Sequence, residues 1–477
     1  MKKLLITLFV CSTFHLMAQS PSDAYIESIM DAGKLPGAEA VIIKNGSWVY
    51  DHGWGLADIP GSKPVTRHSV FMLASVSKTM IATSLMMLWE RGAFRLDDNI
   101  NHYLPFNVIN PSHPEDSITF RTLVTHTSSI QDNLFVLDSI YVYGDSPVSL
   151  DSFLRNYFVP EGSYYDRPRN FYTYHSGIGY NYSNIGATLA AYLVQRISGD
   201  DYSHFCDTAI FEKLCMDHTS YLLSGFSDTS LIARPYSWNG SGYDDDGLYG
   251  YPDYPDGQLR TDITALSRFM TMYMQYGVYN GTRLLDSTTV ALIMSTQYPS
   301  FPGQGIIFGA RTIPGGDILW GHYGGDAGAS TAMCFSYIKK TGVIVLTNGD
   351  GQNTIFTQKI LDTLYHYGQT ISPGPSDTFP ACTWFPADIN NPAEAVSNQP
   401  DIYPNPVNDN LTINMGGSAL PIGITLTITN ILGVTLFELK DFKGAQADIN
   451  TTLFTPGLYL LTIQNGNQKT VSKFVKN

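Results

Sequence analysis

The chain has 477 residues, of which 43% are hydrophobic and 13% aromatic, and its formal net charge is −14. This composition is that of a folded protein with room for two or three domains, and it excludes a largely disordered chain. The negative charge argues against a nucleic-acid partner and against binding to an anionic membrane surface.

Residues 1–19 are predicted to form a secretory signal peptide. Lys2 and Lys3 precede an apolar stretch, and Ala18 is a suitable cleavage residue before Gln19. A membrane anchor is the less favoured alternative, because polar residues interrupt the apolar stretch after only a few positions. No later apolar run is long enough to cross a bilayer, so we expect no transmembrane anchor.

Four cysteines follow this leader, at positions 206, 215, 334 and 382. An even number in an exported chain permits disulfides without defining their pairing. Cys206 and Cys215 fall in one helical-looking stretch, where they would be roughly 13 Å apart and could not pair unless the helix breaks. No cysteine or histidine cluster has zinc spacing, and we expect neither a metal nor another cofactor.

The first predicted elements are a β-hairpin and a buried helix. Val41-Ile42-Ile43 and Trp48-Val49-Tyr50 flank Asn45-Gly46, a strong signal for a two-residue turn. A helical stretch begins near Ala74. The apolar positions that predict its burial are Val76, Met80, Ile81, Met87, Leu88 and Trp89.

The start of this helix carries a candidate nucleophile. Ser75 and Lys78 are three residues apart, so the ammonium can reach the hydroxyl on the same helical face. Free backbone N–H groups and the helix dipole favour negative charge there, which suits a nucleophilic serine. The pattern alone is weak, since about one match is expected by chance, and a solvated lysine at a polar helix start is the alternative. A second match, Ser336 with Lys339, lies in a predicted strand that points the two side chains to opposite faces.

The middle of the chain contributes Tyr182. Residues 118–128 are predicted to be a short helix that leads into a turn, where we interpret His126 as a loop-pinning residue rather than a catalytic base. The aromatic stretch 160–182 is typical either of a pocket rim or of packing between loops. A second helix is predicted from about Asn184, with Ser183 or Asn184 as its cap, which places Tyr182 on the preceding loop.

Strands return late in the chain. Residues 332–338 and 343–347 are predicted to form a hairpin, with a helix over 354–367 after it. An early and a late hairpin with helices between them predict one antiparallel sheet built from both ends of this domain. Residues 372–399 are a proline-rich linker, and a small β-sandwich of five strands is predicted beyond it. These strands are expected at 411–415, 424–430, 433–439, 457–463 and 469–475.

Three motifs together resemble the serine β-lactamase and penicillin-binding-protein superfamily, in particular its class C and esterase-like branch. They are, in chain order, Ser75-x-x-Lys78, Tyr182-Ser183-Asn184 and His322-Tyr323-Gly324-Gly325. The resemblance covers roughly residues 22–370. It implies an α/β (α+β) fold of the β-lactamase/DD-peptidase type, with an antiparallel sheet flanked by helices and a helical subdomain.

The resemblance also implies a role for each residue of the first two motifs. Ser75 matches the acylated nucleophile, and Lys78 matches the lysine that keeps the serine poised and helps to move its proton. Tyr182 matches the tyrosine that accepts this proton and later activates water. Asn184 matches the amide that orients the lysine and the substrate.

The third motif departs from the family's usual Lys-Thr-Gly. His322-Tyr323-Gly324 takes its place on the strand that walls the site, and the N–H groups of Ser75 and Gly325 would form the oxyanion hole. A literal Lys340-Thr341-Gly342 is set aside, because it lies on a predicted turn with its lysine toward solvent. A further departure is Ser129, where many relatives have glycine. Since a histidine is largely neutral at pH 7.5, we expect weak β-lactam hydrolysis and better turnover of neutral esters or amides.

The C-terminal stretch has a resemblance of its own. Residues 401–407, Asp-Ile-Tyr-Pro-Asn-Pro-Val, and the terminal Lys473-Phe474-Val475-Lys476 are similar to a type A sorting domain of the type IX secretion system. This resemblance covers about residues 400–477 and implies contact with the secretion machinery and passage across the outer membrane. A carbohydrate- or protein-binding sandwich is the alternative. The expected domains are therefore a leader (1–19), a hydrolase domain (20–371), a linker (372–399) and a sorting sandwich (400–477).

The function that these features predict is a serine hydrolase, secreted or at the cell surface, that acts through an acyl-enzyme intermediate. Small-molecule or peptide substrates fit the motifs, whether esters, amides or D-amino-acid peptides. The alternative is a penicillin-recognising or catalytically inactive binding protein of the same fold. Sensors of that kind usually carry a membrane span, and an inactive protein would normally have lost Ser75, Lys78 or Tyr182, all of which are present.

Overall fold

The computed structural model describes residues 21, 23–349, 354–375, 377–382, 401–403, 407–414, 424–430, 434–444, 446–465 and 468–476. Contacts between Cα atoms divide the chain into two units, residues 1–384 and 385–477, and each is described by itself. The predicted signal peptide and residues 383–399 of the predicted linker lie outside the described residues.

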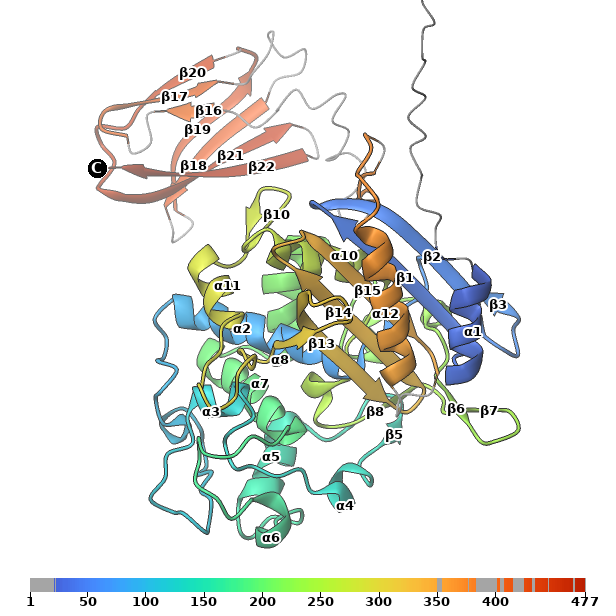
Figure 1. The fold of residues 1–477 in the computed structure, drawn as a ribbon. Coiled ribbons are helices and arrows are strands. Elements are labelled where there is room, and N and C mark those ends of the chain that lie inside the picture. Colours follow the sequence, from blue (N-terminus) through green and yellow to red (C-terminus); the bar gives the residue numbers. More distant parts are fainter. Residues whose placement is uncertain are drawn as a thin grey trace, which may run out of the picture. The chain divides into compact units, whose positions relative to one another are not determined.

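Within the described residues, the first unit is built on a seven-stranded antiparallel sheet (Figure 1). In spatial order its strands are β12 (Gly309–Thr312), β13 (Ile318–Asp326), β14 (Ala329–Ser336), β15 (Thr341–Thr347), β1 (Gly37–Lys44), β2 (Ser47–Asp58) and β3 (Lys63–Pro64). The register of β1 against β15 runs from Ala38 opposite Thr347 to Lys44 opposite Thr341. The two hairpins therefore meet in mid-sheet, which confirms the predicted sheet from both ends of the domain.

The early hairpin shows how local sequence sets this sheet. Asn45 and Gly46 have φ angles of 53° and 80°, the left-handed pair that a tight two-residue hairpin turn needs. Along β1, Val41 and Ile43 face one hydrophobic cluster, and Ala40 and Ile42 face the other. Because side chains alternate across a strand, this apolar run fills both faces of a sheet that is covered on both sides.

Helices cover the two faces of the sheet (Figure 1). On one face, α1 (Asp23–Gly33) and α12 (Thr354–Gly368) pack their apolar side chains, including Ile360 and Leu364, against the strands. On the other face, α10 (Ile263–Met274) joins the large cluster that continues into the helical region. The site described below lies where this helical region meets β13.

The helical region consists of short and medium helices with small strand pairs between them. Besides α10, its helices are α2 (Lys78–Glu90), α3 (Phe120–Val124), α4 (Leu134–Leu137), α5 (Leu150–Phe158), α6 (Arg167–Asn170), α7 (Asn184–Ser198), α8 (Tyr202–Cys206), α9 (Glu212–Leu214) and α11 (Ser287–Ile293). The strand pairs are β4 (Phe71–Met72) with β9 (Arg260–Thr261), β5 (Val142–Tyr143) with β8 (Tyr249–Gly250), β6 (Tyr236–Trp238) with β7 (Tyr243–Asp245), and β10 (Val278–Tyr279) with β11 (Thr282–Arg283).

A disulfide ties the segment after α12 back to the first unit. Cys215 pairs with Cys382 across 167 residues of sequence, while Cys206 and Cys334 are buried free thiols. Cys206 lies within one unbroken helical run formed by α8, the π-helix η3 (Asp207–Phe211) and α9, and Cys215 caps the end of this run in the left-handed conformation. Phe379 packs edge-on against Trp48. Residues 377–382, which fall within the range predicted as a linker, are thus part of the first unit.

The second unit is a sandwich of two sheets. One sheet contains β16 (Asp401–Tyr403), β17 (Asn410–Asn414) and β20 (Gln446–Asn450), and the other contains β19 (Thr435–Phe442), β18 (Ile424–Asn430), β21 (Gly457–Asn465) and β22 (Gln468–Lys476). Leu411 from the first sheet and Leu426 and Leu461 from the second share one core. The expectation of five strands was too low for the described residues. The two missed strands, β16 and β20, are short and carry few apolar side chains.

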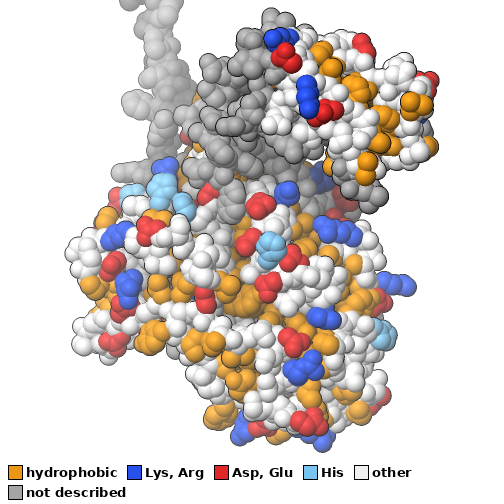
Figure 2. All heavy atoms as spheres, turned by 180° about the vertical axis from the view of Figure 1, so that it is seen from behind, with side chains coloured by type: hydrophobic (Ala, Val, Ile, Leu, Met, Phe, Trp, Pro, Cys, Tyr) orange, Lys and Arg blue, Asp and Glu red, His pale blue; other side chains and the backbone are white. Residues whose placement is uncertain are grey.

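Figure 2 shows how charged side chains are distributed over one face of the molecule. On the face shown in Figure 2, lysine and arginine side chains are interspersed with aspartate and glutamate over the described part of the molecule, without an extended basic patch. None of the described helices combines the length and the apolar character that a membrane span requires.

Candidate active site

The candidate nucleophile stands on a short 3-10 turn. This turn, η1 (Ala74–Ser77), runs directly into α2, so the predicted helix start is a tighter turn followed by an α-helix. Ala74 has a φ of 46°, a left-handed conformation that is unusual for alanine and turns the chain just before Ser75. Leu73 N–H donates to the Leu259 carbonyl at 2.8 Å, and Leu259 N–H donates to Ser77 Oγ at 3.2 Å. These bonds fix the turn on both sides of Ser75.

Lys78 lies directly beside the candidate nucleophile. Its side chain is 0% exposed, and its ammonium donates to Ser75 Oγ at 3.1 Å and to the Asp256 carbonyl at 2.7 Å. Burial would lower the pKa of Lys78, but Tyr182 and Asp256 together raise it above its usual value. The predicted contact between lysine and serine is therefore present, with the lysine as an ammonium ion.

Tyr182 is brought to this pair by the N-terminus of α7. The Lys78 ammonium lies 5.1 Å from the centre of the Tyr182 ring, and the phenol is hydrogen-bonded to both Lys78 and Ser75. Burial raises the pKa of Tyr182 above its usual value, although the neighbouring ammonium lowers it. Ser183 caps α7, because its Oγ accepts from the Gly186 N–H at 2.9 Å, and so fixes where Tyr182 stands.

Asp132, which the sequence did not single out, anchors the same motif. Its carboxylate accepts from the Ser183 hydroxyl at 2.9 Å, the Asn184 N–H at 2.8 Å and the Ile185 N–H at 3.1 Å. A carboxylate at a helix N-terminus is stabilised by the free N–H groups and by the helix dipole. Asp132 is therefore a positioning residue for Tyr182 and Asn184.

His126 pins the loop, as expected, and also borders the site. Its Nδ1 accepts from the Ser183 N–H at 3.2 Å, which leaves the proton of the neutral ring on Nε2. The imidazole packs against the Tyr182 ring at a centroid distance of 4.5 Å, and within the described residues Nε2 has no hydrogen-bond partner. Burial, with Lys78 and His322 nearby, lowers the pKa of His126 to about 3. This ring is therefore neutral and can present an N–H donor to a ligand.

Strand β13 supplies the opposite wall. His322 donates from Nδ1 to the Tyr323 carbonyl at 2.7 Å, so its Nε2 is the acceptor. Burial and the nearby Lys78 lower the pKa of His322 to about 4. A Cβ on Gly324 would come within 2.4 Å of the Leu73 carbonyl oxygen and 3.0 Å of Ser75 N. Only glycine allows β13 to approach the Ser75 turn this closely.

Asn184 and Gly325 face Ser75 from another side. Both line a cavity of about 90 Å³, here called the smaller cavity, together with Ser75, Tyr141, Tyr251, Asp253, Asp256 and Asp326. Lys78 donates to Ser75 Oγ and to the Asp256 carbonyl, as described above. Among the described residues, no hydrogen bond joins the Asn184 side chain to Lys78. The structure thus brings all seven predicted site residues around one point.

A larger cavity opens on the other side of Ser75. It measures about 460 Å³, and its lining includes Ser75, His126, Tyr182, His322, Arg311 and Tyr323. Arg311 donates to the Tyr323 hydroxyl at 2.6 Å and pairs with the Asp362 carboxylate. The positive charge of Arg311 is therefore already matched by a carboxylate. The polar groups nearest Ser75 in this lining include the neutral rings of His126 and His322 and the phenol of Tyr182, and the lining also contains the uncharged side chains of Tyr180, Gln304 and Thr354.

The two rejected motifs lie elsewhere. Ser336 is the last residue of β14, and Lys339 follows in the turn between β14 and β15. Lys340 is exposed on the same turn with a φ of 48°. Neither lysine lines the larger or the smaller cavity.

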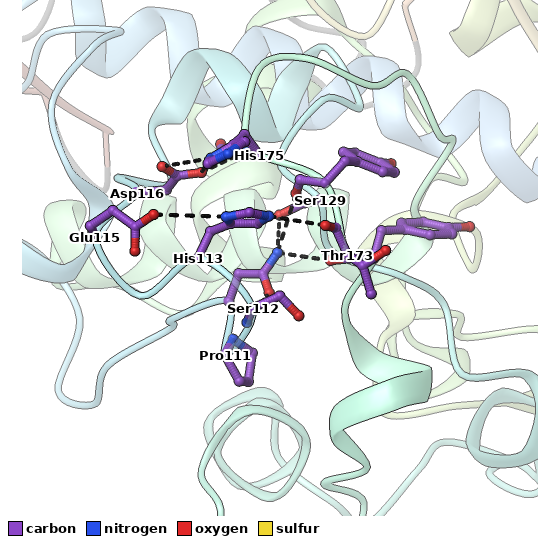
Figure 3. A network of polar contacts seen from close by, with 12 residues as sticks. Pro111, Ser112, His113, Glu115, Asp116, Ser129, Thr173 and His175 are labelled. Carbon is purple, nitrogen blue, oxygen red and sulfur yellow. Dashed lines mark hydrogen bonds and ion pairs between the residues drawn. The ribbon is translucent and has the colours of Figure 1, made fainter.

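A polar network holds the segment that leads to Tyr182 (Figure 3). His113 Nε2 donates to the Thr173 carbonyl at 2.9 Å, and His175 Nδ1 contacts the Asp116 carboxylate at 2.9 Å. The two imidazoles pack against each other with their centroids 3.6 Å apart and their planes tilted by 35°. Together with Glu115, these histidines have possible metal-ligand atoms within 4.8 Å of one another. The spacing of these residues in the sequence had not indicated a metal-binding cluster. Since His113 Nε2 and His175 Nδ1 are already bound to the Thr173 carbonyl and the Asp116 carboxylate, we interpret this group as a contact that holds two loops together.

Ser129 belongs to the same network. Its φ of 62° is in the left-handed region that favours glycine, and its Oγ accepts from Asn110 Nδ2 at 2.9 Å. Asn110 also donates to the Tyr172 carbonyl at 2.9 Å. Serine in place of glycine at position 129 therefore strains the backbone. It also adds a hydrogen bond to Asn110, which in turn holds the aromatic segment at Tyr172.

A serine, a lysine and a tyrosine in contact where a helical region meets an antiparallel sheet define the serine β-lactamase and penicillin-binding-protein superfamily. The chain belongs to the Beta-lactamase family, whose sequence model matches residues 22–363. A second family model, for a secretion system C-terminal sorting domain, matches residues 401–477.

Individual relatives agree with this assignment. A penicillin-binding protein of Bacillus subtilis (strain 168) is 24% identical over 356 residues, which cover 68% of this chain and 71% of that protein. Among solved structures, D-amino acid amidase from Ochrobactrum anthropi SV3 is 20% identical with a TM-score of 0.57, over 72% of this chain and 96% of that one. The class C β-lactamase from Rhodobacter sphaeroides is 19% identical with a TM-score of 0.56, over 72% of this chain and 98% of that one. These likenesses establish the fold.

Proposed function

We propose that this protein is an exported serine hydrolase that forms an acyl-enzyme at Ser75. The observation that carries the proposal is the fully buried Lys78 ammonium, 3.1 Å from the Ser75 hydroxyl, with the Tyr182 phenol bonded to both. Esters, amides and peptides are the substrate classes. The relatives named as an amidase and a β-lactamase support acyl transfer from an amide, and the sorting domain indicates export across the outer membrane.

In the proposed reaction, Ser75 Oγ bonds to the substrate carbonyl carbon. Its proton passes to the deprotonated Tyr182 phenol, with Lys78 holding the negative charge in place. The oxyanion is held by the N–H groups of Ser75 and Gly325. The bond to the leaving group then breaks, and Tyr182 gives the proton to that group. Water then loses a proton to Tyr182 as its oxygen bonds to the acyl carbon. The bond to Ser75 Oγ breaks, Tyr182 returns this proton to Ser75, and the acyl group leaves as an acid.

The polar groups of the larger cavity favour an uncharged leaving group. His322 is neutral at physiological pH because burial and Lys78 lower its pKa to about 4. Arg311 is paired with Asp362. A carboxylate in this cavity would therefore find no free cation, whereas an ester or amide leaving group finds an N–H donor on His126 and an acceptor on His322.

A covalent probe tests the proposal. Ser75→Ala should abolish labelling by a fluorophosphonate and turnover of a p-nitrophenyl ester, whereas Ser336→Ala, in the other Ser-x-x-Lys sequence, should preserve both. Labelling that persists in Ser75→Ala would overturn the assignment. A wild-type protein that is labelled by penicillin but turns over no ester or amide would be a binding protein instead.

A further inference from the structure

Two histidines and a glutamate gather outside the active site, where two loops meet (Figure 3). His113 and Glu115 come from one loop, and His175 comes from the loop that continues toward Tyr182. Each of the three side chains offers a possible metal-ligand atom, and these atoms all lie within 4.8 Å of one another. None of the three lines the larger or the smaller cavity. The chemistry at Ser75 therefore does not explain why they gather.

The contacts of His113 show which of its ring nitrogens is free for a ligand. Nε2 lies 2.9 Å from the Thr173 carbonyl oxygen, which can only accept, so Nε2 carries a proton. In the neutral ring Nδ1 then holds a lone pair, and Nδ1 lies 3.7 Å from a carboxylate oxygen of Glu115. A lone pair and a carboxylate oxygen repel each other unless a proton or a metal cation lies between them.

His175 shows the same pattern. Its Nδ1 lies 2.9 Å from the Asp116 carboxylate and donates to it, so Nε2 holds the lone pair of the neutral ring. Asp116 also accepts from the Ser176 N–H at 3.1 Å, which fixes the carboxylate. A histidine that binds a metal ion usually donates its other ring N–H to a carboxylate or to a backbone carbonyl. Asp116 and the Thr173 carbonyl are such partners for the two rings.

The packing of the two rings favours one shared cation over two protons. Their centroids are 3.6 Å apart and their planes are tilted by 35°. If both rings were protonated, two positive charges would be in contact and would repel each other. A single divalent ion bound to both lone pairs and to the Glu115 carboxylate removes this repulsion, and it also separates His113 Nδ1 from the carboxylate oxygen.

The donor atoms indicate which metal would bind. Two imidazole nitrogens and one carboxylate oxygen are a donor set typical of Zn²⁺, whereas Ca²⁺ and Mg²⁺ prefer oxygen ligands. The ligand atoms of a tetrahedral Zn²⁺ lie roughly 3.4 Å apart, so the three side chains must approach one another on binding. The side chains of Glu115 and His175 are 67% and 54% exposed, which leaves them room to move.

From these contacts we infer that His113 Nδ1, His175 Nε2 and a carboxylate oxygen of Glu115 bind one Zn²⁺ ion, with water completing its coordination. The ion would strengthen the contact between the two loops, one of which leads to Tyr182. Since its ligands line neither cavity, the ion holds the loops together and takes no part in acyl transfer. The inference therefore stands apart from the proposed function.

Zinc binding by the full chain, without an affinity tag, tests the inference. The protein is freed of metal with a chelator, dialysed and titrated with ZnCl₂ in a calorimeter, and its Tm is measured with and without Zn²⁺. We expect one Zn²⁺ per chain and a higher Tm, with no such response to Ca²⁺. Asp116→Asn should weaken binding by roughly tenfold to a hundredfold, and loss of a ligand in Glu115→Gln by at least as much.

A matched control separates this site from other surface histidines. His204 is exposed and lies 3.8 Å from the Asp200 carboxylate, so His204→Gln removes a histidine paired with an acidic residue outside the group. This variant should bind Zn²⁺ as the wild type does. If Asp116→Asn does not fold, Glu115→Gln still decides, because it changes only an exposed side chain.

Three results would overturn the inference. Equal Zn²⁺ affinity in wild type, Glu115→Gln and Asp116→Asn would mean an adventitious ion only. Loss of binding in His204→Gln would assign the ion to a different site. A wild type that binds no Zn²⁺ would show that a protonated His113 pairs with Glu115 instead. Labelling and turnover at Ser75 enter none of these measurements, so each result leaves the proposed function untouched.

Discussion

The protonation states of the groups around Ser75 determine how this site can react. Ser75, Lys78 and Tyr182 form one hydrogen-bonded group. Burial lowers the pKa of Lys78 and raises that of Tyr182, and with the effects of their neighbours both pKa values lie above their usual values. In the free protein near neutral pH, the ammonium and the phenol therefore both hold their protons. Since neither can then accept the serine proton, the reactive form is the one in which the pair has lost a proton.

These protonation states predict that the activity rises toward alkaline pH. The value of kcat/KM for an uncharged ester should rise with pH from 6.5 to 9, because the fraction of the deprotonated lysine–tyrosine pair rises about tenfold per pH unit below its pKa. His126 and His322, whose pKa values are lowered to about 3 and about 4, should add no step in this range. Steady-state kinetics with p-nitrophenyl propionate measures the profile. A kcat/KM that reaches its plateau below pH 7 would show that Lys78 and Tyr182 are not both protonated near neutral pH.

His322 makes a second prediction at the residue scale. His322→Lys would place an ammonium where the wild type has a neutral ring, so kcat/KM for the carboxylate-bearing substrate nitrocefin should rise by about tenfold relative to a neutral ester. The comparison is made for wild type and variant across pH 5.5 to 8.5, with the exposed His68→Lys as control. A wild type that already prefers nitrocefin by orders of magnitude, and does not respond to the substitution, would disprove the explanation.

At the scale of elements, helix and strand ends do most of the positioning. Helix α7 presents Tyr182 and Asn184 because Ser183 caps it and Asp132 binds its first N–H groups. Such a carboxylate typically contributes about 0.3–2 kcal/mol. Strand β13 meets the Ser75 turn only because Gly324 has no side chain. Both elements therefore carry sequence features that serve the site rather than the core.

Strand β1 contains a buried group with a measurable effect on stability. Glu39 is 1% exposed, and burial, followed by Asp51, raises its pKa to about 8. Since the folded-state pKa lies above the unfolded one, the stability that protonated Glu39 contributes is fully present below about pH 4.5 and is lost as the pH rises through about 8.

Glu39→Gln should therefore stabilise the protein increasingly as the pH rises. Glutamine cannot ionise, so the gain relative to wild type should grow between pH 5 and 9, to on the order of 2–4 kcal/mol. Thermal or urea unfolding at several pH values measures the difference, and the exposed Glu27→Gln serves as control. A gain that is the same at every pH would show that the ionisation of Glu39 is not its cause.

At the scale of the whole molecule, the boundary of the first unit is set by the disulfide. The Cys215–Cys382 bond and the packing of Phe379 against Trp48 hold residues 377–382 on the first unit. The sorting domain begins at residue 401 in the family match. A chain that ends at residue 372 would lose both contacts, whereas one that ends at residue 384 would keep them.

These two truncations should therefore differ. The chain that ends at residue 384 should keep the hydrolase activity, and the chain that ends at residue 372 should be less stable by about 2–5 kcal/mol, because it lacks a bond that closes a long loop. Unfolding under oxidising conditions measures this, and Cys382→Ser in the longer chain separates the disulfide from the packing. Equal stability of the two chains would place the boundary at residue 372 after all.

The sequence by itself determined what depends on neighbours along the chain. The left-handed pair Asn45-Gly46 requires a tight turn, the i to i+3 spacing brings Lys78 to Ser75, and Ser183 caps the helix that follows Tyr182. These features follow from backbone geometry over a few residues. The order of motifs was enough to predict the family and the six residues that the structure places around Ser75.

Only the tertiary structure decided what depends on segments far apart in the sequence. It pairs Cys215 with Cys382, sets Asp132 at the start of α7, and brings Asp253 and Asp326 to the same cavity. No periodicity marks such residues, because an aspartate on a solvated loop and one that is buried near the candidate nucleophile have the same local sequence character. Their burial is decided by how helices and strands pack, and with it their pKa and the chemistry that they can support.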